Sequence, residues 1–183
     1  MSAQPLTRLV VHINSDRGCL TSRCSCSGLL CSNGEEVSES AIAALTAGEF
    51  GVPIIMASGD DCLEAEIAET LGPLVEVAVT KKALSYHAAE CLRPVDAQAL
   101  VKQKAAAALA KYKEGESSLF TAAPGPITLD ISTKNYRPIE MLNFLPNVER
   151  IDSHTARFVV EDMCEAVRMI EFVTGSGVTD LSP

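Results

Sequence analysis

The segment from Asn33 to Asp61, NGEEVSESAIAALTAGEFGVPIIMASGDD, constrains the fold of this chain more than any other. Apolar residues recur at helical spacing over residues 37–48, and Gly51 followed by Pro53 is typical of a helix end. The apolar run that follows, residues 52–57, is continuous, as it is in a buried strand of a parallel sheet. A helix, a buried strand and an acidic turn in this order predict an α/β protein.

The rest of the chain first continues this alternation and then changes its pattern. We predict a strand over 9–13, a helix over 61–71, a strand over 74–79, helices over 83–91 and 94–113, a loop over 115–125, a strand over 127–131, a helix over 138–145, a long strand or hairpin over 148–160 and an amphipathic helix over 162–174. The strand over 127–131 alternates apolar and polar residues, which predicts one exposed face.

The predicted fold class is therefore α/β, with a mostly parallel sheet flanked by helices and a C-terminal α+β subdomain. We expect the α/β domain to comprise residues 1–114 and the subdomain residues 115–183. Gly115 to Gly125 is the predicted linker or surface loop between them.

Charge and hydropathy argue against two classes of partner. The formal net charge is −9, and the densest basic group, Lys102, Lys104, Lys111 and Lys113, is interpreted as the solvated face of a helix. Nucleic-acid binding requires a basic footprint, and no such footprint is present in the sequence. No apolar window is long enough for a membrane span, and the N-terminus lacks a signal-peptide layout, so we expect a cytoplasmic protein.

Seven cysteines bear on the redox compartment. An odd number without a signal peptide predicts a reducing compartment and free thiols. Four of them lie within residues 19–31 with the spacing C-x4-C-x-C-x4-C. A zinc knuckle there stays open as an alternative, although structural zinc sites usually pair a C-x2-C or C-x4-C with a second pair further along the chain.

Three positions are candidates for chemistry, and each has a structural alternative. Ser58 to Asp61 follow a predicted strand, where open α/β sheets bind ligands, but Gly59 can be a simple turn and Asp60 or Asp61 a helix cap. Glu39 lies early in a helix, where a carboxylate is favoured by the helix dipole. His12 lies in or after an apolar strand, where it can be a hydrogen-bonded histidine or a neutral metal ligand.

The search for known catalytic motifs narrows the possible functions of the chain only a little. The sequence contains no GxGxxG, Walker, GxSxG or HExxH motif, so nucleotide binding and the hydrolases built on these motifs gain no support. An α/β protein that binds a small ligand at residues 58–61 remains one interpretation.

From Asn33 to about Val173 the chain resembles the zinc-dependent D-aminopeptidase family, of the type found in bacterial dipeptide-transport operons. The matching words are NGEEVSES, AALTAGEFGVPIIMASGDD, VAVTKKALSYHAAECLRP, and ITLDI followed by FLPNVERIDSHTARFVVEDMCEAVRMI. The resemblance implies a two-metal aminopeptidase with zinc as cofactor and a small peptide with an N-terminal D-residue as substrate. In such a site the metals polarise the scissile carbonyl and lower the pKa of a bridging water. It also implies a homo-oligomeric ring.

By this resemblance, two residues of the sequence correspond to metal ligands of the family. Glu39 matches the family's late metal-ligand glutamate, and His12, in VVHINSDRGCL, aligns across one gap with a metal-ligand histidine. The family's Asp-x-Glu motif and a further histidine ligand have no counterpart, and Ser22 stands about where the catalytic histidine belongs. Because a catalytic zinc usually has three protein ligands, we expect an incomplete metal site and no catalytic residue.

Two interpretations of the whole chain follow from this comparison. The first is an N-terminally truncated or divergent member of the aminopeptidase family, with doubtful activity of its own. The alternative is a non-catalytic relative that acts as an oligomeric structural or binding module.

Overall fold

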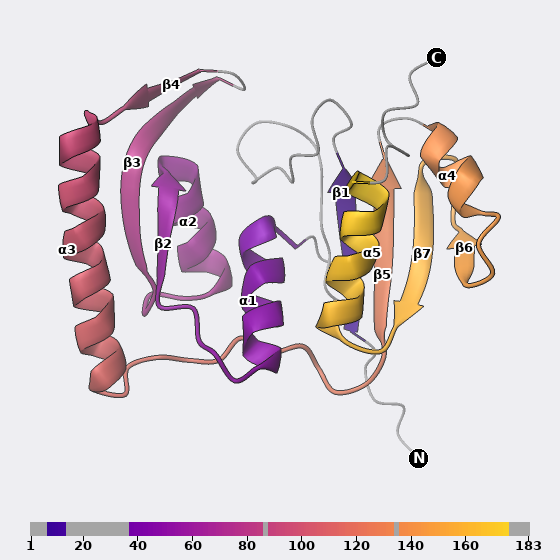
Figure 1. The fold of residues 1–183 in the computed structure, drawn as a ribbon, viewed down its shortest axis with the longest axis horizontal. Coiled ribbons are helices and arrows are strands. Elements are labelled where there is room, and N and C mark those ends of the chain that lie inside the picture. The colour runs from indigo at the N-terminus through magenta and orange to yellow at the C-terminus, as the bar shows by residue number, and fades with distance from the viewer. Residues whose placement is uncertain (1–6, 14–36, 86–87, 134–135, 176–183) are drawn as a thin grey trace. The chain divides into compact units, whose positions relative to one another are not determined.

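A computed structural model describes residues 7–13, 37–85, 88–133 and 136–175. These residues form two compact units, drawn as ribbons in Figure 1. Of the described residues, the first unit contains 7–13, 37–42 and those from 122 onward, and the second contains those from 43 to 121. Each unit is built on its own β-sheet, so we describe the two separately.

The first unit contains a four-stranded sheet with the strand order β1-β5-β7-β6. Its strands are β1 (Thr7–Ile13), β5 (Ile127–Thr133), β7 (Thr155–Val160) and β6 (Val148–Arg150). β1 and β5 run parallel, whereas β5 with β7 and β7 with β6 run antiparallel. The hairpin of β6 and β7 confirms the second of the two arrangements predicted for residues 148–160.

Two helices, α4 (Tyr136–Leu142) and α5 (Met163–Gly175), pack against β5 and β7. The core of this unit consists of fully buried side chains from the sheet and both helices, among them Leu129, Ile131, Ile139, Met163 and Val173. Burying side chains of this size contributes about 1.5–3 kcal/mol each, so this layer is a main source of the unit's stability.

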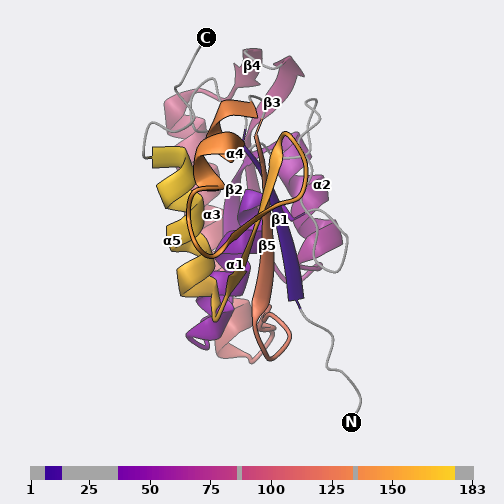
Figure 2. The same cartoon turned by 90° about the vertical axis from the view of Figure 1, so that its right-hand side faces the viewer.

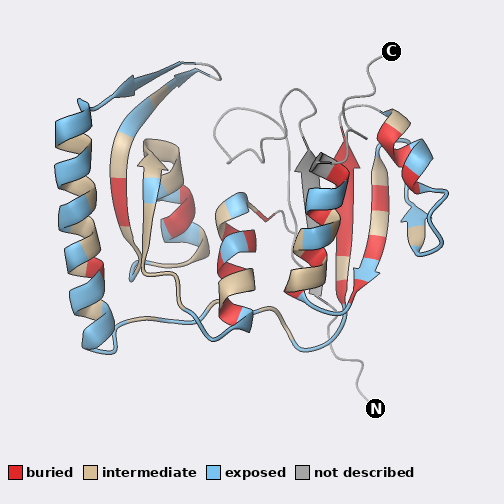
Figure 3. Ribbon diagram, viewed as in Figure 1, coloured by how far each residue is buried: buried red, intermediate tan, exposed pale blue. Residues whose placement is uncertain are grey.

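The β5 strand is buried along most of its length, as Figure 3 shows, and not half-exposed as predicted. β5 is paired on both edges, with β1 and β7, and in addition α4 and α5 contact it and Arg157 of β7 covers Asp130. Its apolar residues Leu129 and Ile131 alternate with Asp130 and Ser132, and all four are buried. The polar residues in the pattern therefore indicate buried polar contacts and not an exposed face.

The second unit contains a three-stranded sheet with the order β2-β3-β4. Its strands are β2 (Met56–Asp60), β3 (Glu76–Ser85) and β4 (Ala88–Cys91), and its helices are α2 (Asp61–Thr70) and α3 (Pro94–Lys113). β2 and β3 run parallel, and β4 is antiparallel to β3. Figures 1 and 2 show α2 and α3 on opposite sides of the strands β2 and β3, which both helices contact.

The helix α1 (Glu39–Glu49) begins in the first unit and ends in the second. Ser38 precedes it, and its Oγ accepts a hydrogen bond of 3.3 Å from the backbone N–H of Ala41, as an N-cap does. Gly51, with φ of 70°, ends the turn after the helix, which confirms the predicted stop.

The helix predicted over residues 83–91 is wrong. β3 continues to Ser85, and β4 returns antiparallel to it with Lys81 opposite Cys91 and Ala83 opposite Ala89. Helix propensity is a weak preference of less than about 1 kcal/mol per residue, so the ladder between the two strands can override the Ala-rich local sequence. His87 lies outside the described residues.

The strand predicted over residues 52–57 begins later than expected. Pro53 has no N–H to donate to a ladder, and β2 pairs with β3 only from Met56, opposite Glu76, onward. Ser58, Gly59 and Asp60 are consequently part of the strand rather than a loop after it.

The α/β class is confirmed, whereas the mostly parallel sheet is confirmed only in part, since each sheet contains one parallel pair beside antiparallel pairs. The compact units also divide the chain differently from the predicted 1–114 and 115–183, because β1 pairs with β5 and so belongs with the C-terminal part. The helices predicted over 61–71, 94–113 and 162–174 correspond to α2, α3 and α5. No helix in the described part of the chain has the length and hydropathy of a membrane span.

Candidate metal centre

Glu39, the predicted carboxylate ligand, is the first residue of α1 and is exposed. It belongs to the first unit, which also contains β1. The positive end of the helix dipole favours a negative charge at this position. The Glu39 carboxylate is therefore accessible, as a metal ligand must be.

His12, the predicted histidine ligand, is the last residue but one of β1. Its position in the sheet is fixed by the parallel register with β5, in which His12 is opposite Ser132 and Ile13 opposite Thr133. Both strands thus end at the same edge of the sheet. The carboxyl ends of parallel strands are the edge at which α/β sheets usually bind their ligands.

The β5 residues at this edge are polar and buried. The Ser132 and Thr155 hydroxyl groups are 2.8 Å apart and share a hydrogen bond between β5 and β7. The backbone N–H of Thr133 donates to the carbonyl of His154 at 2.8 Å. These contacts hold the end of β5 firmly in place and so fix the strand against which β1 is aligned.

A buried ion pair between Asp130 and Arg157 lies two residues before Ser132 on β5. Arg157 of β7 donates two hydrogen bonds to the Asp130 carboxylate, from Nε at 2.7 Å and from Nη2 at 2.8 Å. The Asp130 side chain is only 1 % exposed and that of Arg157 is 25 % exposed. The hydrogen bonds to Asp130 raise the pKa of Arg157 above its usual value. Sequence reasoning missed this pair, because its partners are 27 residues apart and meet only through strand pairing.

The acidic turn at residues 58–61 has a structural role. Asp60 has an extended backbone, with φ of −97° and ψ of 179°, and its Oδ1 accepts a 2.9 Å hydrogen bond from the N–H of Leu63, which caps α2. Asp61 Oδ1 accepts a 2.9 Å hydrogen bond from the N–H of Ala83 in β3. Both carboxylates thus serve backbone donors, so the helix-cap alternative is supported.

Gly59 is explained by packing and not by the approach of a ligand. A Cβ at this position would lie 2.5 Å from Cδ2 and 3.3 Å from Cβ of Leu63, so a larger residue would require that side chain to shift. Its carbonyl accepts a 3.2 Å hydrogen bond from the Thr80 hydroxyl, which joins β2 to β3.

The cysteines are only partly as predicted. Cys91 and Cys164 are free, as expected, but Cys62 is in a disulfide, so the expectation of free thiols is wrong at that position. Asp60, Asp61 and Cys62 offer ligand atoms within 4.8 Å of one another, yet a disulfide sulfur is not the thiolate that binds metals. The cluster at residues 19–31 lies outside the described residues.

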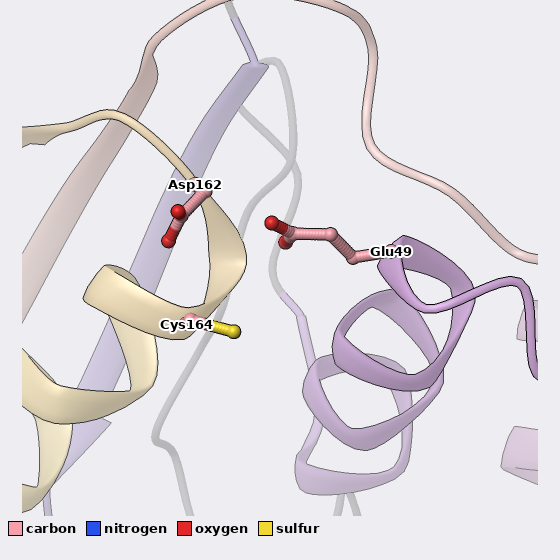
Figure 4. A group of neighbouring side chains, drawn as sticks. All are labelled: Glu49, Asp162 and Cys164. Atoms are coloured by element: carbon pink, nitrogen blue, oxygen red, sulfur yellow. The ribbon is translucent and has the colours of Figure 1, made fainter.

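Figure 4 shows a second group of metal-binding side chain types, Glu49, Asp162 and Cys164. Asp162 precedes α5, and its Oδ1 accepts a 2.7 Å hydrogen bond from the N–H of Glu165 in the manner of a cap. Asp162 and Cys164 belong to the first unit and Glu49 to the second. We assign no site to residues of different units.

The donor types at Glu39 and His12, a carboxylate oxygen and an imidazole nitrogen, are both common zinc ligands. Among the side chains that the structure describes, however, no set of three metal-binding groups includes Glu39. The ligand roles of Glu39 and His12 therefore stay a prediction, and so does the incompleteness of the site.

Comparison with known proteins identifies the family. A model of the D-aminopeptidase family matches residues 22–172. The chain is 34 % identical over 143 residues to a D-aminopeptidase of Bacillus subtilis (strain 168), a match that covers 78 % of this chain and 51 % of that protein. The chain thus spans about half the length of this curated relative.

A solved structure supports the same assignment. The fold matches that of the zinc-dependent D-aminopeptidase DppA from Bacillus subtilis, a self-compartmentalizing protease, with a TM-score of 0.73 and 28 % sequence identity. The match covers 88 % of this chain and 61 % of the other. These matches confirm the resemblance and overturn the interpretation as an unrelated α/β protein. The chain belongs to the D-aminopeptidase family.

Proposed function

We propose that this chain carries the fold of a zinc metallo-aminopeptidase that acts on small peptides with an N-terminal D-residue, and that Glu39 and His12 are ligands of its zinc. The family match over residues 22–172 carries this proposal. The accessible Glu39 carboxylate at the start of α1, and the place of His12 at the carboxyl edge of the β1–β5 pair, are consistent with these roles.

Glu39 and His12 would supply different ligand atoms to the ion. Glu39 would supply a carboxylate oxygen and a negative charge, and His12 a neutral imidazole nitrogen from the end of a paired strand. When bound, zinc polarises a carbonyl group and lowers the pKa of a bound water. Because a catalytic zinc usually has three protein ligands, we also propose that this chain alone binds zinc more weakly than a complete site does.

A second candidate function is that of a non-catalytic oligomeric module. It is favoured by the observation that no set of three metal-binding side chains in the described residues includes Glu39. Because the solved relative is a self-compartmentalizing protease, we propose that this chain also associates with copies of itself, whether or not it is catalytic. The absence of nucleic-acid and membrane partners and the cytoplasmic location stay predictions.

The zinc content of the purified chain tests the ligand assignment. We would dialyse the wild-type chain, Glu39→Gln and Glu64→Gln against trace zinc, and then measure zinc per chain by elemental mass spectrometry. Glu64 is a matched control, since it is also an exposed glutamate in the first turn of a helix, α2. We expect zinc to be retained by the wild type and by Glu64→Gln and lost by Glu39→Gln, with unchanged circular dichroism spectra. Equal zinc in all three proteins would sink the assignment of Glu39.

Hydrolysis of a pair of stereoisomeric dipeptides tests the activity. With zinc present, release of the N-terminal residue from the D-isomer but not from the L-isomer supports the aminopeptidase. A folded wild-type chain with near-zero zinc and no hydrolysis of either isomer would refute zinc-dependent catalysis by this chain and favour the non-catalytic module.

A further inference from the structure

An apolar surface stands out on α4 and the turn that follows it. Four large apolar side chains are exposed there: Tyr136 (47 %), Met141 (51 %), Phe144 (89 %) and Leu145 (38 %). We refer to these four residues as the α4 patch. Single exposed apolar residues are common on proteins, but an almost fully exposed phenylalanine in the same short segment as three other such residues is typical of an interaction surface.

The geometry of α4 explains why these side chains point outward. The opposite side of the helix, formed by Pro138, Ile139 and Leu142, is buried in the core of the first unit. The turn continues past the helix, with hydrogen bonds from Phe144 N to Met141 O (3.1 Å) and from Leu145 N to Leu142 O (2.9 Å). Met141 at the end of α4 and Phe144 and Leu145 in this turn are all exposed, so the apolar surface continues past the end of the helix.

The charges around the patch are balanced, unlike those of the chain as a whole. Residues 136–150, YRPIEMLNFLPNVER, contain Arg137 and Arg150 together with Glu140 and Glu149, so their charges cancel, whereas the chain has a net charge of −9. Two copies of a strongly acidic protein repel each other over most of their surface. The segment that contains the α4 patch therefore adds no net charge to that repulsion.

The balance of positive and negative charges in this segment also favours a second copy of the chain as the partner. In a twofold contact the same surface meets itself, so residue i of one copy contacts residue j of the other and the reverse. A rim that contains two arginines and two glutamates can then place opposite charges against each other, while the apolar side chains meet at the centre. Aromatic residues at the centre of an interface usually contribute most to its affinity.

We propose that the α4 patch is the surface through which two copies of this chain associate, with Phe144 at its centre. The inference rests on the self-association proposed above and names the residues that produce it. A standard interface buries about 800 Å² on each partner, so the patch would be the apolar centre of a larger contact that includes the charged rim.

Sedimentation velocity over a dilution series tests the proposal. The proteins are the wild-type chain, Phe144→Glu, Met141→Ser and the control Phe172→Glu, which changes an exposed phenylalanine on α5 of the same unit. We expect Phe144→Glu to weaken self-association about tenfold or more, Met141→Ser to weaken it less, and Phe172→Glu to leave it unchanged. Circular dichroism of each variant checks the fold, and Met141→Ser still tests the patch where the glutamate variant fails to fold.

The outcomes separate this inference from the proposed function. A wild-type oligomer whose mass and affinity are the same in Phe144→Glu and Met141→Ser would overturn the role of the patch and leave self-association intact. A wild-type chain that is monomeric at the highest concentration would overturn both self-association and the patch. Neither result depends on zinc or on peptide hydrolysis, which are tested by the metal content and the isomer assay.

Discussion

Replacing Arg157 by methionine should destabilise the first unit far more than replacing a surface arginine. Methionine keeps much of the length and apolar volume of the side chain but removes both hydrogen bonds to Asp130. The Asp130 carboxylate, 1 % exposed, would then remain in the sheet without its guanidinium partner. Removing one partner of a buried ion pair is one of the few changes that cost several kcal/mol.

The magnitude follows from the exposure of the two partners. Removing one member of a fully buried pair costs about 3–5 kcal/mol, whereas an exposed pair contributes about 0–1 kcal/mol. Arg157 is 25 % exposed, so water can reach the place of its guanidinium and solvate the carboxylate in part. We therefore expect Arg157→Met to lower the free energy of unfolding by about 2–4 kcal/mol.

Urea unfolding followed by far-UV circular dichroism measures this loss. Arg150→Met is the matched control, because Arg150 lies on the neighbouring strand β6 and donates one exposed hydrogen bond of 3.1 Å to the carbonyl of Asp152. We expect the control to lose less than about 1 kcal/mol. The double variant Asp130→Leu with Arg157→Met should recover much of the loss, since no buried charge remains. Equal stability of Arg157→Met and Arg150→Met would refute the reasoning.

Two further predictions concern the second unit. Glu76 of β3 accepts hydrogen bonds from Lys104 (2.8 Å) and Lys111 (2.5 Å) of α3, and these lysines lower its pKa below 4.5. A carboxyl group whose pKa is lowered by folding stabilises the fold above its unfolded pKa, and this contribution is lost as the pH falls. Glu76→Gln should therefore lower the free energy of unfolding by about 0.5–1 kcal/mol at neutral pH and leave it unchanged in strong acid. A difference in unfolding free energy that stays constant across pH would contradict this. Gly48→Ala should destabilise by about 1–3 kcal/mol in thermal unfolding although alanine favours helices, because its Cβ would clash with the backbone carbonyl of Phe120; a gain in stability would contradict the packing.

The sequence predicted the elements whose signals are local. The cap at Asp60 and the glycine after α1 both lie within one or two turns of the helix ends that they specify. The amphipathic pattern over residues 162–174 likewise indicated a helix, and Met163, Ile170 and Val173 form part of the buried side of α5. Caps, stops and periodicity are properties of neighbouring residues, so one sequence is enough to read them.

The predictions failed where the decisive partner is distant in the sequence. β4 looked helical because its own residues favour a helix, and only its pairing with β3 makes it a strand. Lys104 and Lys111 were interpreted as a solvated face, yet both bind Glu76, at 28 and 35 residues' distance in the sequence. Asp130 and Arg157 meet for the same reason, and strand pairing cannot be deduced from either segment alone.

The structure also changes which acidic residues bear on function. Asp60 and Asp61, the most conspicuous carboxylates in the sequence, accept hydrogen bonds from the backbone of α2 and β3, and Gly59 near the end of β2 makes room for Leu63. Their identity is accounted for by the fold. Glu39 differs, because its carboxylate is exposed at the start of α1 and any residue with good helix propensity would serve the helix there nearly as well. A change at Glu39 that leaves stability intact but removes zinc would therefore report on function alone, which no change at residues 58–61 can do.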